Sequence, residues 1–278
     1  MKRIAVVAVA LLATAAWAQI DDNFDSYATG PLSVVSGGVW NTWGGASTDA
    51  QVIDMGLSAP NSQFHDGVGV PDVVTYGAGS ALSGAGSVAT LSFDFLTHEV
   101  GGGTNPEGYQ DMDTYIFVGS GNPGDLSTNY GSVIGVFIID WAWIDDVGFS
   151  PVHLWDVAGE GGGGDYGIAE LARGLVGDQW HHVELVATQA VDDMTANDPL
   201  DADGFFDVYV DTVLCTPTPL PFGLDDPMGL NALELYSFED EQPEAPDDYH
   251  LFDNFLLTPE PASLGLLVLG AVALLRRR

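Results

Sequence analysis

The sequence predicts an all-β fold, an antiparallel β-sandwich of the jelly-roll kind, from three observations. Apolar and polar residues alternate along several short segments between residues 20 and 258, which is the period of half-buried strands. Turn-forming residues gather between these segments, and the chain contains 35 glycines and 15 prolines. The same span shows no convincing helical pattern. Many strands with turn signals and without helices are typical of a sandwich or jelly roll.

Six segments carry the strand pattern. Four of them alternate, and they cover residues 87–97, 180–189, 205–214 and 248–257. In the last of these, the alternation predicts that Tyr249, Leu251, Phe255 and Leu257 share a face with Asp253. Two further strands are predicted at 113–119 and 132–144, and the second is apolar on both faces, which indicates a central strand.

The charge is strongly one-sided, because 40 acidic residues stand against six Lys and Arg. Between residues 19 and 258 there are 39 acids and one base, Arg173, so this body carries a net charge of −38. Such a balance excludes a nucleic-acid binder and argues against docking on an anionic membrane surface. The single cysteine, Cys215, excludes an intramolecular disulfide and a zinc site built on cysteines.

The N-terminus reads as a secretory signal peptide over residues 1–18. Lys2 and Arg3 form the charged region, residues 4–15 are apolar, and Ala16 and Ala18 place small residues before the predicted cleavage at Gln19. The body over residues 19–258 is expected to be a single sandwich domain, because sandwiches of this length are common as one domain.

The C-terminal segment 259–278 has three parts in order. They are Pro259-Glu260-Pro261, the apolar run 264–275 and the basic end 276–278. The run is short for a full membrane span, and the arginines would hold that end on the cytoplasmic side. The segment resembles the PEP-CTERM sorting signal of Gram-negative bacteria. The resemblance implies an apolar sorting helix, transient inner-membrane anchoring, cleavage by an exosortase-type protease, and delivery to the cell surface or extracellular matrix.

Several stretches of the body resemble the laminin G-like branch of the concanavalin A-like lectin/glucanase jelly rolls. The opening stretch 22–27 and Trp40 resemble the first strand and its sequel, residues 180–185 and 206–211 resemble the paired central strands, and residues 251–255 resemble the closing strand.

Glycosidases of that superfamily carry an E-x-D-x-E or E-x-D-x-x-E pattern on one strand, which places carboxylates on one side of a cleft. The sequence contains no such pattern, and the cluster Glu239-Asp240-Glu241 lacks the spacing. We therefore expect no enzymatic activity. His181 and His182 are adjacent on a predicted strand and so point to opposite faces, which favours a structural role over a shared metal.

Calcium is the metal that the abundant carboxylates favour. The resemblance to jelly-roll carbohydrate-binding modules implies a structural Ca²⁺ between an acid near the first strand and an aspartate of the last. Asp25 and Asp253 match those positions, with Asp22 as a spare.

Trp141 and Trp143 lie at alternate positions and so on one strand face. Their indoles are candidates for stacking on sugar rings. Phe137 and Ile139 share that face, so packing in the core is the alternative that the usual burial of tryptophan favours.

The sequence thus predicts an exported, surface-sorted and non-catalytic jelly roll that interacts with carbohydrate or an exopolysaccharide matrix. Two alternatives stay open, namely a glycan-degrading hydrolase with an atypical arrangement of acids and a purely structural matrix protein.

Overall fold

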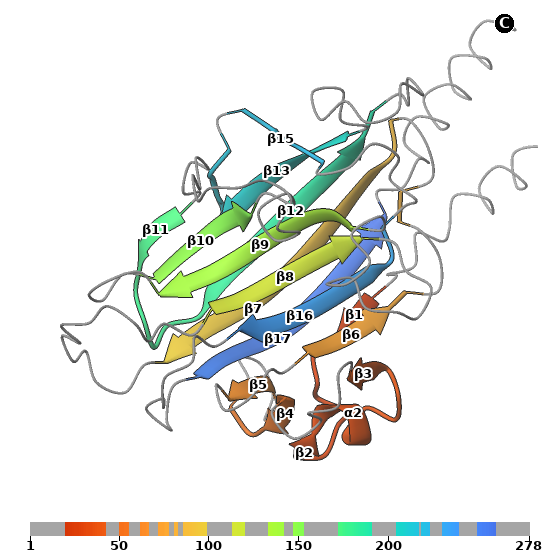
Figure 1. Cartoon of the computed structure of the whole chain (residues 1–278), viewed down its shortest axis with the longest axis vertical. Helices are drawn as coiled ribbons and strands as arrows, with labels where there is room; N and C mark the ends of the chain where they lie inside the picture. Colours follow the sequence, from red (N-terminus) through yellow and green to blue (C-terminus); the bar gives the residue numbers. More distant parts are fainter. Residues whose placement is uncertain are drawn as a thin grey trace, which may run out of the picture.

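The computed structural model describes residues 20–42, 50–55, 62–66, 72–77, 81–82, 86–98, 113–119, 133–141, 147–152, 172–190, 204–216, 218–222, 230–238 and 249–259. These residues form two antiparallel sheets that lie face to face (Figure 1). The predicted all-β sandwich is therefore confirmed. None of the described segments is a helix long and apolar enough to cross a membrane.

The larger sheet has ten strands and joins the first described strand to the last. Along the sheet the order is β14 (Val213–Leu214), β13 (Gly204–Val210), β12 (His181–Gln189), β7 (Val88–His98), β17 (Tyr249–Pro259), β5 (Ser62–Asp66), β4 (Ala50–Ile53) and β2 (Gly30–Pro31). Two further strands attach beside this path, β1 (Ile20–Asp22) on β17 and β15 (Leu220–Pro221) on β13.

The smaller sheet has seven strands. Their order is β11 (Ala172–Leu175), β10 (Val147–Val152), β9 (Val133–Trp141), β8 (Asp113–Gly119), β16 (Ala232–Phe238), β6 (Asp72–Tyr76) and β3 (Trp40–Thr42). One short helix, α2 (Leu32–Val35), lies between β2 and β3 in the sequence. The expectation of a body without helices is thus corrected by one turn of helix.

The core lies between the sheets because each strand turns alternate side chains inward. On β7 the inward residues are Leu91, Phe93 and Phe95, and all three are buried in the main core cluster. From the other sheet Phe137 reaches Phe206 of the ten-stranded sheet, with an edge-on ring contact at 5.5 Å. Strand β9 contributes to this core and to a second apolar cluster outside it, which confirms the prediction that this strand is apolar on both faces.

The predicted strand 205–214 is interrupted by a tight turn. Asp211 and Thr212 both adopt positive φ, at 50° and 69°, so the chain reverses after Val210. Val213 then pairs with Val210 as the edge strand β14. A two-residue turn with both residues left-handed matches the twist of a hairpin.

The predicted facing of residues 248–257 is correct for Phe255 and Leu257, which share the core face, and wrong for the residues before them. In β17 the residues that join the core cluster are Phe252, Phe255 and Leu257, and the register to β7 shifts between Asp253 and Leu256. The cause is a β-bulge at Asn254, whose φ is 56°. Because the bulge adds one residue, the core-facing positions change from even-numbered to odd-numbered: Phe252 faces the core before Asn254, and Phe255 and Leu257 face it after.

Candidate functional site

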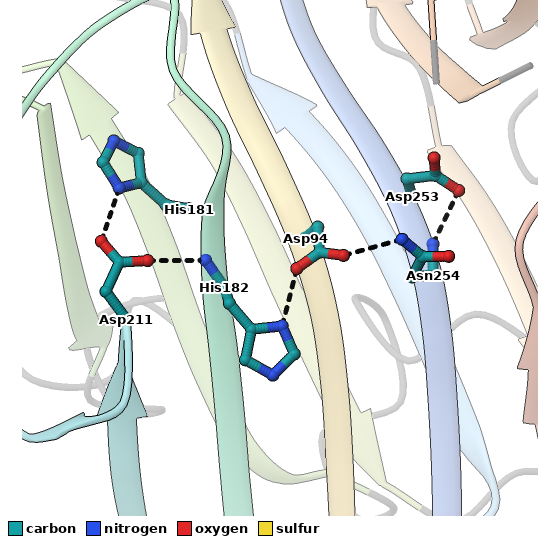
Figure 2. A network of polar contacts seen from close by, with 6 residues as sticks. All are labelled: Asp94, His181, His182, Asp211, Asp253 and Asn254. Carbon is teal, nitrogen blue, oxygen red and sulfur yellow. Dashed lines mark hydrogen bonds and ion pairs between the residues drawn. The ribbon is translucent and has the colours of Figure 1, made fainter. Parts of the chain in front are cut away.

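The outer face of the ten-stranded sheet carries a polar network across three strands (Figure 2). Asp94 of β7 lies between His182 of β12 and Asn254 of β17. The His182 Nδ1 atom is 2.6 Å from Asp94 Oδ1, and the Asn254 side-chain amide donates to Asp94 Oδ2 at 2.8 Å. The Asp94 side chain is largely buried, whereas His182 is 43% exposed. Both carboxylate oxygens are therefore engaged, and the Nδ1 side of the His182 ring is held toward Asp94.

His181 points to the other side of β12. Its side chain is buried, its Nδ1 lies 2.8 Å from Asp211 Oδ2, and its Nε2 lies 3.0 Å from the carbonyl oxygen of Val176. The second Asp211 oxygen accepts the backbone N–H of His182 at 2.9 Å. The expected opposite facing of the two histidines is thus confirmed, and His181 serves to hold the turn after β13.

The environment of His182 favours its protonated form. The hydrogen bond to Asp94 is the main cause that raises the pKa of His182, and the charges of Asp94, Glu184 and Asp211 act in the same direction. Burial opposes them and is the weaker effect in sum. No further nucleophile is hydrogen-bonded to this pair among the described contacts.

The outer face of the seven-stranded sheet is apolar and aromatic instead. Phe117 of β8 is buried there with Val133 and Val136 of β9, while Tyr115 and Tyr236 are half-buried beside them. The three rings contact one another, with centroids 6.4 to 6.5 Å apart. We call Tyr115, Phe117 and Tyr236 the aromatic platform.

A carboxylate lies next to this platform. Glu234 of β16 is the direct cross-strand partner of Phe117 on one side and of Val74 on the other. It alternates with Leu233 and Leu235, which face the core, and so belongs to the outer face. Its side chain has no exposed surface. A buried charge costs several kcal/mol unless other groups compensate it, and Glu234 is not without interaction partners in the structure.

The two predicted calcium ligands differ in setting. Asp253 is fully buried and its Oδ1 accepts the backbone N–H of Asn254 at 2.8 Å, whereas Asp25 is exposed in the turn after β1 and accepts from the Asn23 side chain. Within the described residues, no three His, Cys, Asp or Glu side chains are grouped so as to hold a metal ion. Calcium binding by Asp25 and Asp253 stays a prediction.

Asp22, the spare ligand, has a structural task. Its carboxylate accepts three hydrogen bonds, from the Phe24 backbone, the Tyr27 hydroxyl and the Trp40 indole, at 2.9, 2.7 and 2.7 Å. Burial and the neighbouring carboxylate raise the pKa of Tyr27, so its hydroxyl stays a donor. Because Trp40 begins β3 of the other sheet, Asp22 ties the two sheets together.

The remaining predicted residues lie at or beyond the ends of the described segments. Trp141 ends β9, where its backbone pairs with Val147, and Trp143 lies outside the described residues. Pro259 ends β17, and Glu260 and Pro261, like the signal segment 1–18, lie outside them as well. The sorting motif and the sugar-stacking role of the tryptophans stay predictions.

Sequence reasoning missed both outer-face features. The platform residues and Glu234 come from β8 and β16, and the alternation of residues 232–238 was the available signal for the second strand. The Asp94–His182–Asn254 network joins three strands far apart in the sequence, so no local spacing of residues could predict it.

Comparison with solved structures identifies the fold. The alginate lyase Aly36B superposes with a TM-score of 0.50 at 16% identity, covering 86% of this chain and 96% of its own. Its variant in complex with alginate trisaccharide gives 0.50 at 16% identity, with 88% and 100% covered. An endo-1,3-beta-glucanase from Streptomyces sioyaensis gives 0.51 at 10% identity, with 84% and 94% covered. No protein-family model and no curated protein matches the chain.

The likeness shows that this chain shares the β-sandwich fold of these structures, and it overturns the prediction that the body is not an enzyme. Two of the matched sandwiches are enzymes, a lyase and a glucanase. The prediction rested on a missing E-x-D-x-E pattern. That pattern is one arrangement of catalytic acids, and one fold supports many arrangements, so its absence excludes a motif and not catalysis.

Proposed function

We propose that the protein binds a polysaccharide chain on the outer face of its seven-stranded sheet and cleaves it there. The observation that carries the proposal is the aromatic platform with the Glu234 carboxylate beside it. Aromatic rings suit the C–H faces of sugars, and carboxylates supply the acid and base for glycosidic cleavage. The enzymes that share the fold support the same class of activity.

In this proposal Tyr115 and Tyr236 contact the sugar, because they are the partly exposed rings of the platform. Glu234 is proposed as the first catalytic carboxylate, and because its side chain is buried in the free protein, neighbouring side chains must move for a sugar to reach it. Cleavage with a second carboxylate is the usual scheme, and Asp72 and Asp113 occupy the register positions opposite Tyr236 and Phe238 on the neighbouring strands. One of these two aspartates is the partner that the proposal requires.

Binding is tested by affinity electrophoresis against a panel of soluble polysaccharides. Tyr236→Ala should weaken retardation by the bound polysaccharide about tenfold or more, as loss of a stacking ring does in other binding sites. The matched control is Tyr209→Ala, because Tyr209 is also half-buried on a strand but belongs to the ten-stranded sheet. Equal losses in both variants would mean that the platform is not the binding face.

Cleavage is tested by a reducing-end assay together with the ultraviolet absorbance of unsaturated sugar products. Glu234→Gln should lower the rate about 100-fold or more and leave binding nearly unchanged. Glu184→Gln, a half-buried glutamate of β12 on the other sheet, is the control and should keep the wild-type rate. Asn variants of Asp72 and Asp113 identify the partner. Normal cleavage by a folded Glu234→Gln protein would remove Glu234 from the site.

Export and sorting are proposed from the two ends of the sequence. The mature protein should begin near Gln19 and lack residues 276–278 after processing. Intact-mass measurement of surface-extracted protein checks this, and a mature form that keeps the terminal arginines would contradict cleavage by an exosortase-type protease.

A further inference from the structure

The sheet that carries the aromatic platform is poor in positive charge. The residues of its seven strands include one base and four acids, namely Arg173 against Asp72, Asp113, Asp140 and Glu234. The histidines of the described strands all belong to the ten-stranded sheet instead, and they are His65, His98, His181, His182 and His250. The binding face therefore has no local cation set among its strand residues.

Arg173 is also far from the platform within its sheet. It lies on β11 at the sheet edge, whereas the platform residues lie on β8 and β16, three and four strands away. At about 4.8 Å between neighbouring strands, these separations are about 14 and about 19 Å. The other five bases of the chain are all within three residues of an end of the sequence.

An anionic sugar needs a binding surface with positive charge, which this sheet lacks near the platform. A uronate carboxylate that leaves water requires a positive partner, usually a forked arginine contact, because an unpaired buried charge is costly. Here two acids are direct cross-strand partners of platform residues, the buried Glu234 opposite Phe117 and Asp72 opposite Tyr236, and the body around them carries a net charge of −38. Like charges repel a uronate polymer before contact and inside the site.

We infer that the polysaccharide is uncharged, a neutral glycan rather than a uronate polymer; this inference rests on the proposed function. It also fixes the reaction class. Elimination by a lyase removes a proton that a neighbouring carboxylate acidifies, and a neutral sugar has no such carboxylate. The reaction is therefore hydrolysis. The glycosidic C1–O bond breaks, the leaving oxygen takes a proton from a carboxylic acid, and water gives its oxygen to C1 and a proton to a carboxylate.

The test compares laminarin, an uncharged β-glucan, and galactomannan with sodium alginate and polygalacturonate. Full-length protein is run in affinity electrophoresis at about 0.1 M salt, once with a chelator and once with calcium. We expect retardation by at least one neutral polysaccharide, sensitive to Tyr236→Ala, and none by the two uronate polymers. Binding of the neutral polymer should change less than twofold between about 0.01 and about 0.1 M salt, a range over which the Debye length falls from about 30 to about 10 Å.

The outcomes separate the two proposals. If alginate or polygalacturonate binds at least as tightly as every neutral polysaccharide, with or without calcium, and this binding depends on Tyr236, the inference is overturned while the proposed function stands. If no polysaccharide binds in a Tyr236-dependent way, both the proposed function and the inference are contradicted. On the cleaved neutral glycan, new reducing ends without ultraviolet-absorbing product are expected, and an unsaturated product would overturn hydrolysis. A variant with Arg276, Arg277 and Arg278 changed to Gln controls for adsorption of anions by the basic end.

Discussion

His250 of β17 is a neutral histidine of the core. It is fully buried, its Nδ1 lies 2.7 Å from the Thr114 hydroxyl across the two sheets, and burial lowers the pKa of His250 to about 3. In the unfolded chain a histidine titrates near 6.5. Between these values the unfolded state binds the extra proton, so the free energy of unfolding decreases as pH falls through this window.

We expect this loss to be on the order of 5 kcal/mol for His250 near pH 3. His250→Asn removes the titration and keeps a polar partner for Thr114, so its unfolding free energy, measured in urea, should fall less steeply between pH 6.5 and 4. The comparison concerns the slope, because the smaller side chain also leaves a cavity. Equal pH dependence of the unfolding free energy in the two proteins would show that His250 is also protonated in the folded state over this range.

The titration of His182 changes the unfolding free energy in the opposite direction, and it does so at higher pH than that of His250. Its pKa is raised in the folded protein, chiefly by the hydrogen bond to Asp94. The stabilisation is therefore fully present below the unfolded pKa and is lost as pH rises through the folded pKa. Urea unfolding between pH 6 and 9 should show stability that falls with pH, and His182→Gln should flatten that fall. Asp94→Asn removes the cause and should flatten it too; a fall that persists in both variants would contradict the assignment.

Calcium binding through Asp25 and Asp253 remains our proposal for these residues. Calorimetry should give a saturable signal near one ion per chain, with calcium ahead of magnesium, because a larger and more flexible oxygen shell suits an irregular site. Asp253→Asn keeps an acceptor for the Asn254 N–H but removes the negative charge, so it should abolish the signal, as should Asp25→Asn. Asp21→Asn, an exposed acid on β1, is the matched control. Undiminished calcium binding by Asp253→Asn would contradict the proposal.

At the scale of the element, two glycines let strands approach closely. A Cβ on Gly204, at the start of β13, would lie 2.5 Å from the backbone oxygen of Thr188 and would overlap the Phe222 ring. A Cβ on Gly135 of β9 would meet the Phe206 ring at 2.8 Å and no backbone atom among its nearest contacts. Side chains shift more easily than a paired strand.

Gly204→Ala should therefore destabilise the protein by about 3 kcal/mol and Gly135→Ala by about 1 kcal/mol. Thermal or urea unfolding of the two variants checks the ranking. The reverse order would mean that β13 relaxes more readily than the aromatic contacts behind β9.

Alternation predicted the strands well where the ladder is regular. The predicted range 113–119 coincides with β8, and the predicted strands at 87–97 and 180–189 match β7 and β12 within one residue at each end. It failed where one residue breaks the period. Asn254 and the pair Asp211-Thr212 take left-handed conformations, and asparagine and aspartate are the types that tolerate them, but composition does not say which of many such residues will do so.

The candidate site was less predictable for a different reason. Tyr115 and Tyr236 are 121 positions apart in the sequence and become neighbours only because β16 is inserted between β6 and β8. Strand order is a long-range property that local periodicity does not contain. The sequence therefore indicated that aromatic and acidic residues lie on strands, while the face on which they meet required the topology.

At the scale of the whole molecule, the charge of the body opposes its own compactness. A net charge of −38 over residues 19–258 gives strong self-repulsion at low ionic strength. Raising NaCl from about 0.01 to about 1 M shortens the Debye length from about 30 to about 3 Å. The melting temperature should rise steadily over this range and rise equally with KCl, since screening does not depend on the cation. A flat curve would mean that bound cations already neutralise the acids.

The position of β17 means that the ten-stranded sheet cannot be completed until this strand is available. This strand is the last one that the structure describes, yet it lies in the middle of the ten-stranded sheet, between β7 on one side and β5 on the other (Figure 1). While the ribosome has not yet released residues 249–259, the sheet exists at most as two separate halves. Each half then presents an unpaired inner edge, β7 or β5, which can pair with another chain. The nascent protein is thus most prone to aggregation late in its synthesis, and a chain that stops before Tyr249 leaves both edges open.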